Sequence, residues 1–538
     1  MKAYSIVSVG LTVLLLGANI AGAQEQGSAY KEVGKVHFAV SCTPAAQEQF
    51  DHAVALLHSF FWPETIKAFS AVAATDPTCI MAYWGIAISQ RPNPLIGAPD
   101  YAAQKRGWEA VEKAKTISAK TQREADYIGA MEALYKDYDK ADYHTRVVAY
   151  TKVMEQIYRR YQDDSEAPIF FALALNESAD LFDKTLTNQR KAAAILERAF
   201  AKQPTHPGAA HYLIHSYDYP ALAAQGLPAA IKYAALAPAS PHALHMPSHV
   251  FSMLGLWPDL IMADTNSLAA AEAYSEKNFG GAAYGNILHS MDFLTYAYLQ
   301  TAQDQKAKAM VEKRDGITKW VNHVLPGDMG YAAIPVRYAL ERSQWSEAAA
   351  LQPVESQYLQ AIAIGHFARA LGAARSGRPA ASSADIAKLD ALSKALADAG
   401  NKYWAEQVNI QYGTAKAWVA KAEGRTDEAV ASMRAAANLE DASEKNISME
   451  NRLIPMRELL GDMLLETGQP QAALAAYEQA LTRTPARVRS YYGAAKAAEK
   501  MGDGAKAKGY YRKIVALCPA GNTERPELKE ARAILAKH

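Results

Sequence analysis

Apolar and small residues recur along the chain with a period of about 34 residues, most clearly near the C-terminus. Within one period, apolar positions three and four residues apart predict two helices, each with one buried face. A proline ends the unit at Pro485, and Pro519 follows one period later. The two copies contain Leu460, Gly461, Leu464, Ala473, Tyr477, Ala480 and Pro485, and then Ala507, Tyr511, Ile514 and Pro519. The pattern predicts stacked helical hairpins, because no single hairpin can bury its apolar face alone.

Weaker copies of the same unit extend through most of the chain. Proline-rich segments near residues 91–99 and 325–327 predict loops that interrupt the array. Sustained alternation of apolar and polar residues is nearly absent, so we expect an all-helical protein of about ten to twelve hairpins. The weaker copies are Ala53, Leu56, Phe69 and Pro77; Ala192, Leu196, Ala199 and Pro204; Ala229, Tyr233, Leu236 and Pro241; and Ala429, Met433 and Ala436, which an insertion of about ten residues follows.

The spacing of the small, aromatic and proline residues resembles the tetratricopeptide-repeat consensus. The implied fold class is all-α, a right-handed superhelical solenoid of helical hairpins whose first helices line a concave groove. The chain also resembles a family of secreted bacterial tetratricopeptide-repeat proteins. That resemblance implies a fold and a compartment, and it implies no activity. The matching stretches are residues 57–60, 76–79, 82–87, 211–215, 242–249 and 457–461.

The N-terminus predicts export. Lys2 precedes an apolar stretch, and Ala21 and Ala23 have the spacing of a signal-peptidase site. We therefore expect residues 1–23 to be a cleaved signal peptide and the protein to be periplasmic or secreted, with an uncleaved N-terminal anchor as the alternative. No second segment has the length and hydropathy of a membrane span. The expected organisation is N-terminal repeats in residues 24–90, central repeats with histidine-rich first helices in 91–325, and a C-terminal array in 326–538.

Charge and cysteine content narrow the possible functions. The 57 Lys and Arg residues balance 56 Asp and Glu residues, which gives no electrostatic reason to expect nucleic-acid binding. An exported protein can form disulfides. Cys42 and Cys79 each lie near the start of a predicted hairpin, and either a bridge or two buried thiols fits the sequence. If they are bridged, Cys518 is unpaired.

The histidines follow the repeat. His211 and His215 lie four residues apart, and His245 and His249 repeat that spacing one period later. This register places all four on the first helices of neighbouring hairpins, with each pair on one helix face. His289 follows on the next first helix. The sequence therefore predicts a column of imidazoles on the first helices, and whether the column faces the groove or a seam between helices stays open at this point.

Carboxylates accompany the histidine column. Glu177 lies one period before His211 and belongs to the same column one hairpin earlier. Asp218 and Asp292 are close to the histidines in sequence and are suited to orient imidazoles through their second nitrogens. The candidate ligand-binding residues are Glu177, His211, His215, Asp218, His245, His249, His289 and Asp292.

Such a cluster suits a transition metal. Neutral imidazoles bind zinc, copper, nickel or iron, and two pairs at helical spacing can converge on one ion. An open position on that ion would activate water, with Glu177 as a candidate base. Two alternatives stand beside this hypothesis: a hydrogen-bonded polar ladder between repeats, or a set of side chains that holds an organic ligand. The candidate ligands of a zinc or copper ion are His211, His215, His245, His249 and His289.

Other histidines are interpreted differently, and the common enzyme motifs are absent from the sequence. His58 is interpreted as a structural residue, and His206 and His242 lie near predicted helix starts. The sequence has no nucleophile elbow, phosphate loop, His-Glu-x-x-His motif or haem-attachment motif.

The leading hypothesis is a periplasmic binding or scaffold protein that recognises a peptide, protein or small ligand in its groove. The alternative is a metal-binding protein or metal-dependent enzyme that uses the histidine cluster. Expected partners are proteins or peptides, with no nucleic acid and no stable membrane span after signal cleavage. Whether the protein is an enzyme stays open at this point.

Overall fold

The computed structural model describes residues 32–91, 93–449 and 452–536. Helices account for nearly all of the regular structure in these segments. The described residues form no β-strand, and one isolated bridge joins Ala283 to Trp320. The predicted all-helical fold class is therefore confirmed.

The N-terminal half consists of short helices joined by tight turns. The predicted loop near residues 91–99 contains one 3-10 turn, η1 (Pro94–Ile96). The helices of this half are α2 (Pro44–His58), α3 (Trp62–Thr75), α4 (Ile80–Ile88), α5 (Tyr101–Lys115), α6 (Gln122–Tyr135), α7 (Tyr143–Arg160), α8 (Ala167–Glu177), α9 (Thr187–Lys202), α10 (Pro207–Tyr217), α11 (Ala223–Leu236), α12 (Pro241–His245), α13 (Pro247–Leu254) and α14 (Trp257–Phe279).

The C-terminal half continues the array. It contains a second 3-10 turn, η2 (Pro379–Ser382). Its helices are α15 (Gly285–Gln300), α16 (Asp304–Asp315), α17 (Leu325–Glu341), α18 (Trp345–Ala350), α19 (Leu359–Arg375), α20 (Ser383–Asp398), α21 (Lys402–Ala422), α22 (Thr426–Asp441), α23 (Met456–Glu466), α24 (Pro470–Arg483), α25 (Val488–Lys500), α26 (Gly504–Leu517) and α27 (Pro526–Ala536).

Small residues opposite aromatic rings set the spacing of the hairpins. The ring of Tyr477 on α24 lies against Gly461 of α23 and Gly493 of α25, and a Cβ atom at either glycine would overlap that ring. In the N-terminal half, Gly85 makes the same close approach to the ring of Phe69. This is why the consensus pairs a small residue with an aromatic one: the ring fills the space between two helices that the missing side chain lets approach.

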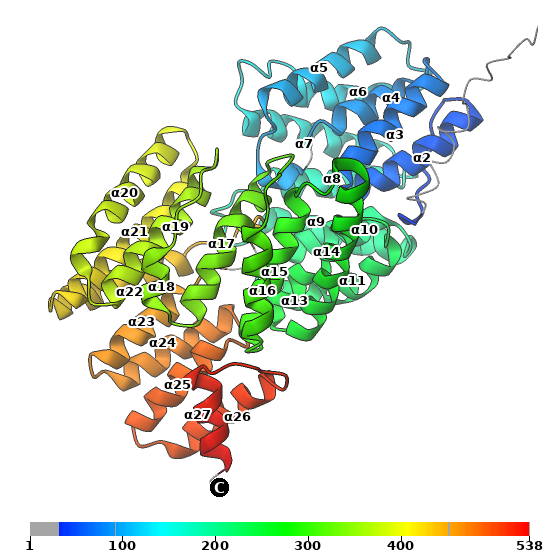
Figure 1. Ribbon diagram of the computed structural model, residues 1–538. Coiled ribbons are helices and arrows are strands. Elements are labelled where there is room, and N and C mark those ends of the chain that lie inside the picture. The colour runs from blue at the N-terminus through cyan, green and yellow to red at the C-terminus, as the bar shows by residue number, and fades with distance from the viewer. Residues whose placement is uncertain (1–31, 92, 450–451, 537–538) are drawn as a thin grey trace, which may run out of the picture.

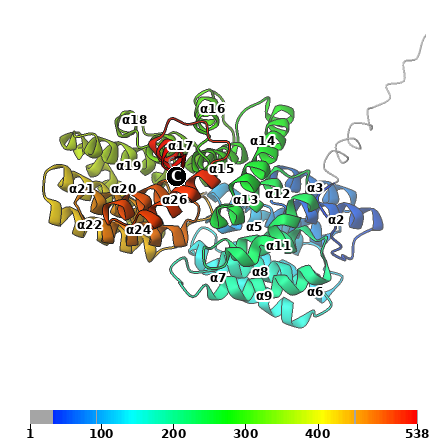
Figure 2. The same cartoon turned by 90° about the horizontal axis from the view of Figure 1, so that it is seen from below.

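The array bends back on itself. Figure 1 shows α2–α7 on one side of the molecule, α19–α22 on the other and α13–α17 between them, and Figure 2 shows α2 and α3 at one end and α19–α22 at the other. The C-terminal repeats return to the centre, where the Trp257 indole donates to the carbonyl of Ala486 at 2.8 Å. Near the C-terminus, the amide of Asn522 donates to the carbonyl of Ala302 at 2.9 Å. The chain is therefore closed by contacts between segments that are far apart in sequence.

A buried ionic network holds this closure. We call it the arginine cluster; Arg487, at 0% exposure, donates to Glu458 at 3.0 Å and to Glu341 at 2.8 Å. Arg489 donates to Glu458 at 2.8 Å and to Asp462 at 2.7 Å. Because Glu341 belongs to α17 and the other residues to the C-terminal repeats, the network fixes α23 and α25 against the central helices.

Several other predictions can be located on this fold. Cys42 and Cys79 are joined by a disulfide, and Cys518 is a buried free thiol. The predicted signal peptide, residues 1–23, lies outside the described residues. In the described part of the chain, no helix combines the length and the hydropathy that a membrane span requires. The predicted domain boundary after residue 90 follows α4, and the one after residue 325 falls in the first turn of α17.

Candidate metal centre

Six histidines from α10, α12, α13 and α15 meet as two groups of three, and we call them together the histidine cluster. Within each group, one nitrogen of every ring lies within 4.8 Å of a nitrogen of the other two. Five of the six side chains are buried and His242 is half-buried. The first trio is His211, His215 and His242, and the second trio is His245, His249 and His289.

The local sequence explains how the helices position these rings. His211 and His215 lie one turn apart on α10, and their ring centroids are 4.8 Å apart. The second pair straddles a break, because α12 ends at His245 and Pro247 begins α13. The rings of His245 and His249 nevertheless lie 4.9 Å apart, as close as the first pair. The break at Pro247 therefore leaves the pairing of the rings intact.

Carboxylates fix the rings of the second trio. His245 Nδ1 lies 2.6 Å from Asp264 Oδ1, and His249 Nδ1 lies 2.8 Å from Asp218 Oδ2. An ionised carboxylate only accepts, so both Nδ1 atoms donate, and a ring that carries no second proton holds a lone pair on Nε2. These two Nε2 atoms face each other at 3.0 Å. Two lone pairs at that separation repel unless a proton or a cation lies with them.

A metal ion fits this geometry. Nitrogens bound to one zinc ion at about 2.0–2.1 Å lie about 2.8–3.4 Å apart for bond angles between about 90° and 109°. Histidine ligands commonly donate their other ring nitrogen to a carboxylate, as His245 and His249 do. His289 supplies a third ring, and its buried Nδ1 has no hydrogen-bond partner among the described residues. The second trio therefore has three imidazoles, with two outer carboxylates already in place.

The first trio has a related arrangement with a carbonyl in place of the carboxylates. His211 Nδ1 donates to the carbonyl of His58 at 2.6 Å, which leaves the lone pair on Nε2. That Nε2 lies 3.1 Å from Nε2 of His242. Both ring nitrogens of His215 are buried and lack a hydrogen-bond partner in the described structure. Buried polar atoms are rarely left in this state, so the nitrogens of His215 are candidate ligand atoms.

One phenylalanine packs against the rings of each trio. The Phe60 ring lies 4.4 Å from His211, 5.5 Å from His242 and 5.9 Å from His215 between ring centroids. Its backbone adopts φ 48°, an unusual conformation for a bulky residue. In the second trio the Phe293 ring lies 4.6–5.1 Å from all three imidazoles. These contacts restrict the ring positions, as a preorganised ligand set requires.

Burial keeps most of these imidazoles neutral. It lowers the pKa of each ring well below the ordinary histidine range, and the neighbouring histidines add to the shift. The residues affected are His211, His215, His242, His249 and His289. A neutral imidazole is the form that binds a metal.

A cavity of about 500 Å³ opens onto both trios. His215 and His242 of the first trio and His249 and His289 of the second lie on its wall. The remaining wall contains aromatic and polar residues, and both interrupting loops contribute to it. Those lining residues include Phe60, Phe61, Trp62, Gln90, Asn93, Asp100, Arg106, Tyr274, Tyr284, Asn286, Asn322, His323 and Pro326.

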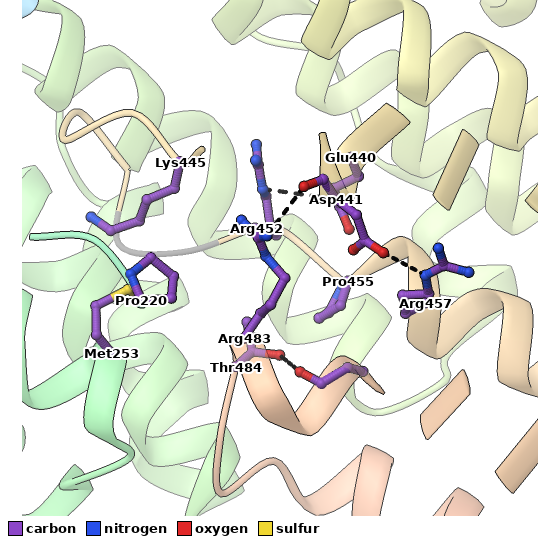
Figure 3. Close-up of a pocket in the computed structure, with 11 residues that line it drawn as sticks. Pro220, Met253, Glu440, Asp441, Lys445, Arg452, Pro455, Arg457, Arg483 and Thr484 are labelled. Carbon is purple, nitrogen blue, oxygen red and sulfur yellow. Dashed lines mark hydrogen bonds and ion pairs between the residues drawn. The ribbon is translucent and has the colours of Figure 1, made fainter. Parts of the chain in front are cut away.

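The insertion after α22 reaches this site from the C-terminal half. Lys445 is buried, and its ammonium lies 3.0 Å from Asp218 Oδ1, while Ile447 lines the cavity. Figure 3 shows the base of this loop, where Lys445, Arg452 and Arg483 surround a small pocket between the two halves. Arg483 donates to the carbonyl of Ser443 at 3.1 Å and thereby helps to hold the loop. Lys445 and Asp218 are 227 residues apart in sequence, so no local sequence pattern predicts their contact.

The structure brings some of the predicted site residues into the histidine cluster and pairs the others with arginines. It brings His211, His215, Asp218, His245, His249 and His289 to the cluster. Glu177 instead forms a buried ion pair with Arg91, and Asp292 accepts from Arg337 at 2.7 Å. Both carboxylates are therefore committed to arginines, and Glu177 is not among the metal-ligating groups of the described residues.

Sequence reasoning missed three residues of the site: His242, Asp264 and Lys445. His242 lies three residues before His245, a helical spacing that places both on one face. This signal was available for His242. Asp264 and Lys445 come from a different helix and a distant loop, and their sequence neighbours carry no indication of the site.

A third group, His58, Glu166 and His206, also has ligand spacing. Here the polar atoms already have partners: Glu166 accepts from His58 at 2.8 Å and from His206 at 2.7 Å, and His58 Nδ1 meets the Tyr212 hydroxyl at 3.0 Å. Burial alone would raise the pKa of Glu166, but His206 and His58 hold it below its usual range. We assign this group a structural role, because it supports the carbonyl that orients His211.

Comparison with known proteins agrees with the repeat analysis. The tetratricopeptide-repeat model matches residues 454–487 and 488–520. The chain carries tetratricopeptide repeats. No curated protein sequence matches it significantly.

Solved structures of other helical-repeat proteins overlap with the chain at low similarity. They include the human IFIT1 dimer with m7Gppp-AAAA (12% identity, TM-score 0.34, 81% of this chain and 90% of that one). They also include the APC/C hetero-tetramer Cut9–Hcn1 (12%, 0.30, 90% and 96%) and Naa15/Naa10 bound to HypK-THB (12%, 0.24, 88% and 70%). Similarity at this level assigns neither a ligand nor an activity to the chain.

Proposed function

We propose that the protein is an exported, metal-dependent ligand-binding protein whose second histidine trio holds a transition-metal ion at the floor of the cavity. One observation carries this proposal. His245 and His249 point their Nε2 atoms at each other at 3.0 Å while Asp264 and Asp218 occupy both Nδ1 atoms. A cation resolves that repulsion, and His289 completes three ligands.

Three histidine ligands leave an open position on a tetrahedral ion, a pattern found in catalytic zinc sites. An ion there would supply a Lewis acid that polarises a bound carbonyl or activates water. The cavity beside it has the size of a small-molecule site, so we propose a small ligand or the end of a peptide as its occupant. The donor set of neutral imidazoles suits zinc, copper, nickel or iron.

Export and a protein partner are further parts of the proposal. The predicted signal peptide supports a periplasmic or secreted location, as does the Cys42–Cys79 disulfide, because disulfides persist in oxidising compartments. Tetratricopeptide repeats commonly present extended surfaces to protein partners, which supports a partner bound outside the cavity.

Elemental analysis of residues 24–538, purified without an affinity tag, tests the metal. We expect at least one equivalent of a transition metal after incubation with zinc or copper and gel filtration. The variant His245→Asn/His249→Asn should lose this ion, because both facing lone pairs are displaced. A wild-type protein that retains no metal, while its circular dichroism remains helical, contradicts the proposal.

The matched control is His144→Ala. His144 lies on α7, is exposed and belongs to none of the three groups of possible ligands among the described residues. Its replacement should leave the metal content unchanged. Equal metal loss in the control and in the double variant would show that histidine removal acts nonspecifically, and it would overturn the assignment to the second trio.

A further inference from the structure

We infer that the protein holds two metal ions, one in each histidine trio, on the wall of one cavity. The inference rests on the proposed function, since it adds an ion in the first trio to the one assigned to the second.

The first trio presents lone pairs as the second does. The carbonyl of His58 accepts from His211 Nδ1 at 2.6 Å and so fixes its Nε2 as the free donor atom. His242 Nε2 lies 3.1 Å from that atom, a separation that one ion at about 2.0–2.1 Å from each nitrogen accounts for. His215 is 4% exposed and has two nitrogens with no partner among the described residues, and one of them serves as third ligand.

Ligand number also favours two ions. A zinc ion takes about four ligands, so six convergent imidazoles exceed what one ion can use. The rings divide into groups of three, yet the groups adjoin: the ring centroids of His215 and His249 are 6.0 Å apart, and those of His242 and His245 are 6.2 Å apart. Rings of both trios line the same cavity. Two ions there would face one ligand.

The charges around the two trios differ, which predicts the order of filling. Asp218 and Asp264 contact the second trio directly, and Lys445 balances one of these charges at 3.0 Å. In the first trio, the backbone carbonyl of His58 takes the place of such a carboxylate by accepting from His211 Nδ1. Glu166 binds the ring of His58 and therefore acts on this trio only through His58. A carboxylate raises the basicity of a histidine ligand more than a carbonyl does. The second trio should therefore bind its ion more tightly and fill first.

Two adjacent ions with open positions bind a ligand through two donor atoms. The proposed ligand class is accordingly an oxyanion, with the aromatic wall at Phe61 and Trp62 in contact with its apolar part.

Copper(II) titration of the metal-free full chain tests the inference by two readouts, the bound equivalents and the electron paramagnetic resonance spectrum. We expect two equivalents in the wild type, the first with the signal of an isolated ion and the second with loss of that signal through coupling. His242→Asn should saturate at one equivalent without coupling. His242 is half-buried, so this substitution disturbs packing less than one at His211 or His215.

The outcomes separate this inference from the proposed function. A wild type that saturates at one equivalent overturns the second ion and leaves the single-ion site. Zero equivalents overturn both. Two equivalents that persist in His242→Asn place the second ion outside the first trio and overturn the inference. If His242→Asn does not fold, the wild-type coupling decides alone: two coupled ions support adjacent sites, and two uncoupled ions contradict them.

Discussion

Two of the buried clusters of polar side chains, the histidine cluster of α10, α12, α13 and α15 and the arginine cluster around α23–α25, differ in how completely their hydrogen bonds are satisfied. In the arginine cluster, every nitrogen of Arg487 donates to a carboxylate or to the hydroxyl of Tyr296. In the histidine cluster, both nitrogens of His215 and one oxygen of Asp264 lack partners among the described residues. A satisfied buried network holds structure together, whereas an unsatisfied one with fixed ring orientations is prepared for a ligand.

The geometry of the groups reinforces this contrast. Arginine and carboxylate are complementary, so Glu458 and Arg487 stabilise each other without a third component. Neutral imidazoles whose lone pairs face each other are not complementary, and the contact between His245 and His249 needs a proton or a cation between the two nitrogens. Buried histidines and buried arginines are both polar, and the orientation of their donors and acceptors distinguishes the two clusters.

The largest expected effect lies in the arginine cluster. Arg487→Met removes a buried cation and leaves the carboxylates of Glu341 and Glu458 without its charge. We expect a loss of about 3–5 kcal/mol in the free energy of unfolding, measured by urea titration. Metal content should be unchanged in the folded variant. A parallel loss of metal would show that the two clusters are one cooperative unit, and it would contradict their separate roles in stability and metal binding.

Acid should weaken the same cluster. Burial alone would raise the pKa of Glu458, but Arg487 and Arg489 lower it to about 2. Because the pKa is lowered in the folded state, this contribution is full above about pH 4.5 and is lost as the pH falls toward 2. The loss amounts to about 3 kcal/mol. Urea titrations at several pH values between 5 and 2 give the free energy of unfolding as a function of pH. This free energy should fall less steeply with pH for Glu458→Gln than for the wild type. An equally steep fall would contradict the role assigned to Glu458.

Metal should stabilise only the protein that retains the histidine cluster. Zinc at a hundredfold excess over its dissociation constant should add about 2.7 kcal/mol to the free energy of unfolding of the wild type. The variant His245→Asn/His249→Asn should show at most the smaller effect of the first trio. Thermal unfolding monitored by circular dichroism, with and without zinc, measures the difference. An equal shift in the variant would place the bound zinc elsewhere.

The smallest expected effect concerns the outer carboxylate of the second trio. Asp264→Asn keeps an acceptor for His245 Nδ1 but removes the charge, so zinc binding should weaken about tenfold to hundredfold. Isothermal titration calorimetry measures this change. The control Asp390→Asn, a carboxylate of α20 whose side chain is 40% exposed, should leave the affinity unaltered. If both variants bind zinc equally, Asp264 does not support the ion.

Much of the fold follows from local sequence. The alternation of Gly461, Tyr477 and Gly493 encodes helix spacing in the C-terminal repeats, and Phe69 with Gly85 does the same near the N-terminus. Such contacts join neighbouring hairpins, and so the period alone predicts them. The register of the histidine pairs follows from the same rule, since equal spacing in sequence places residues at equivalent positions in stacked repeats.

The grouping of the site residues could not be read from that register. The period relates His211 to His245, yet the structure places them in different trios. His242, in the first turn of α12, joins the first trio through its contact with His211, whereas His245 at the end of the same helix belongs to the second trio. Glu177 has the correct register, but the nearby cation Arg91 binds it. Register fixes the helix face, and competing partners decide what each side chain contacts.

The sequence by itself determined the helical repeats and the placement of four histidines on neighbouring first helices. Only the tertiary structure decided that the array closes through Arg487 and that Lys445 reaches Asp218. The physical reason is the range of the interactions. Repeat packing acts between adjacent hairpins and leaves a periodic trace in the sequence, whereas the contacts of Arg487 with Glu341 and of Lys445 with Asp218 join distant segments and leave none.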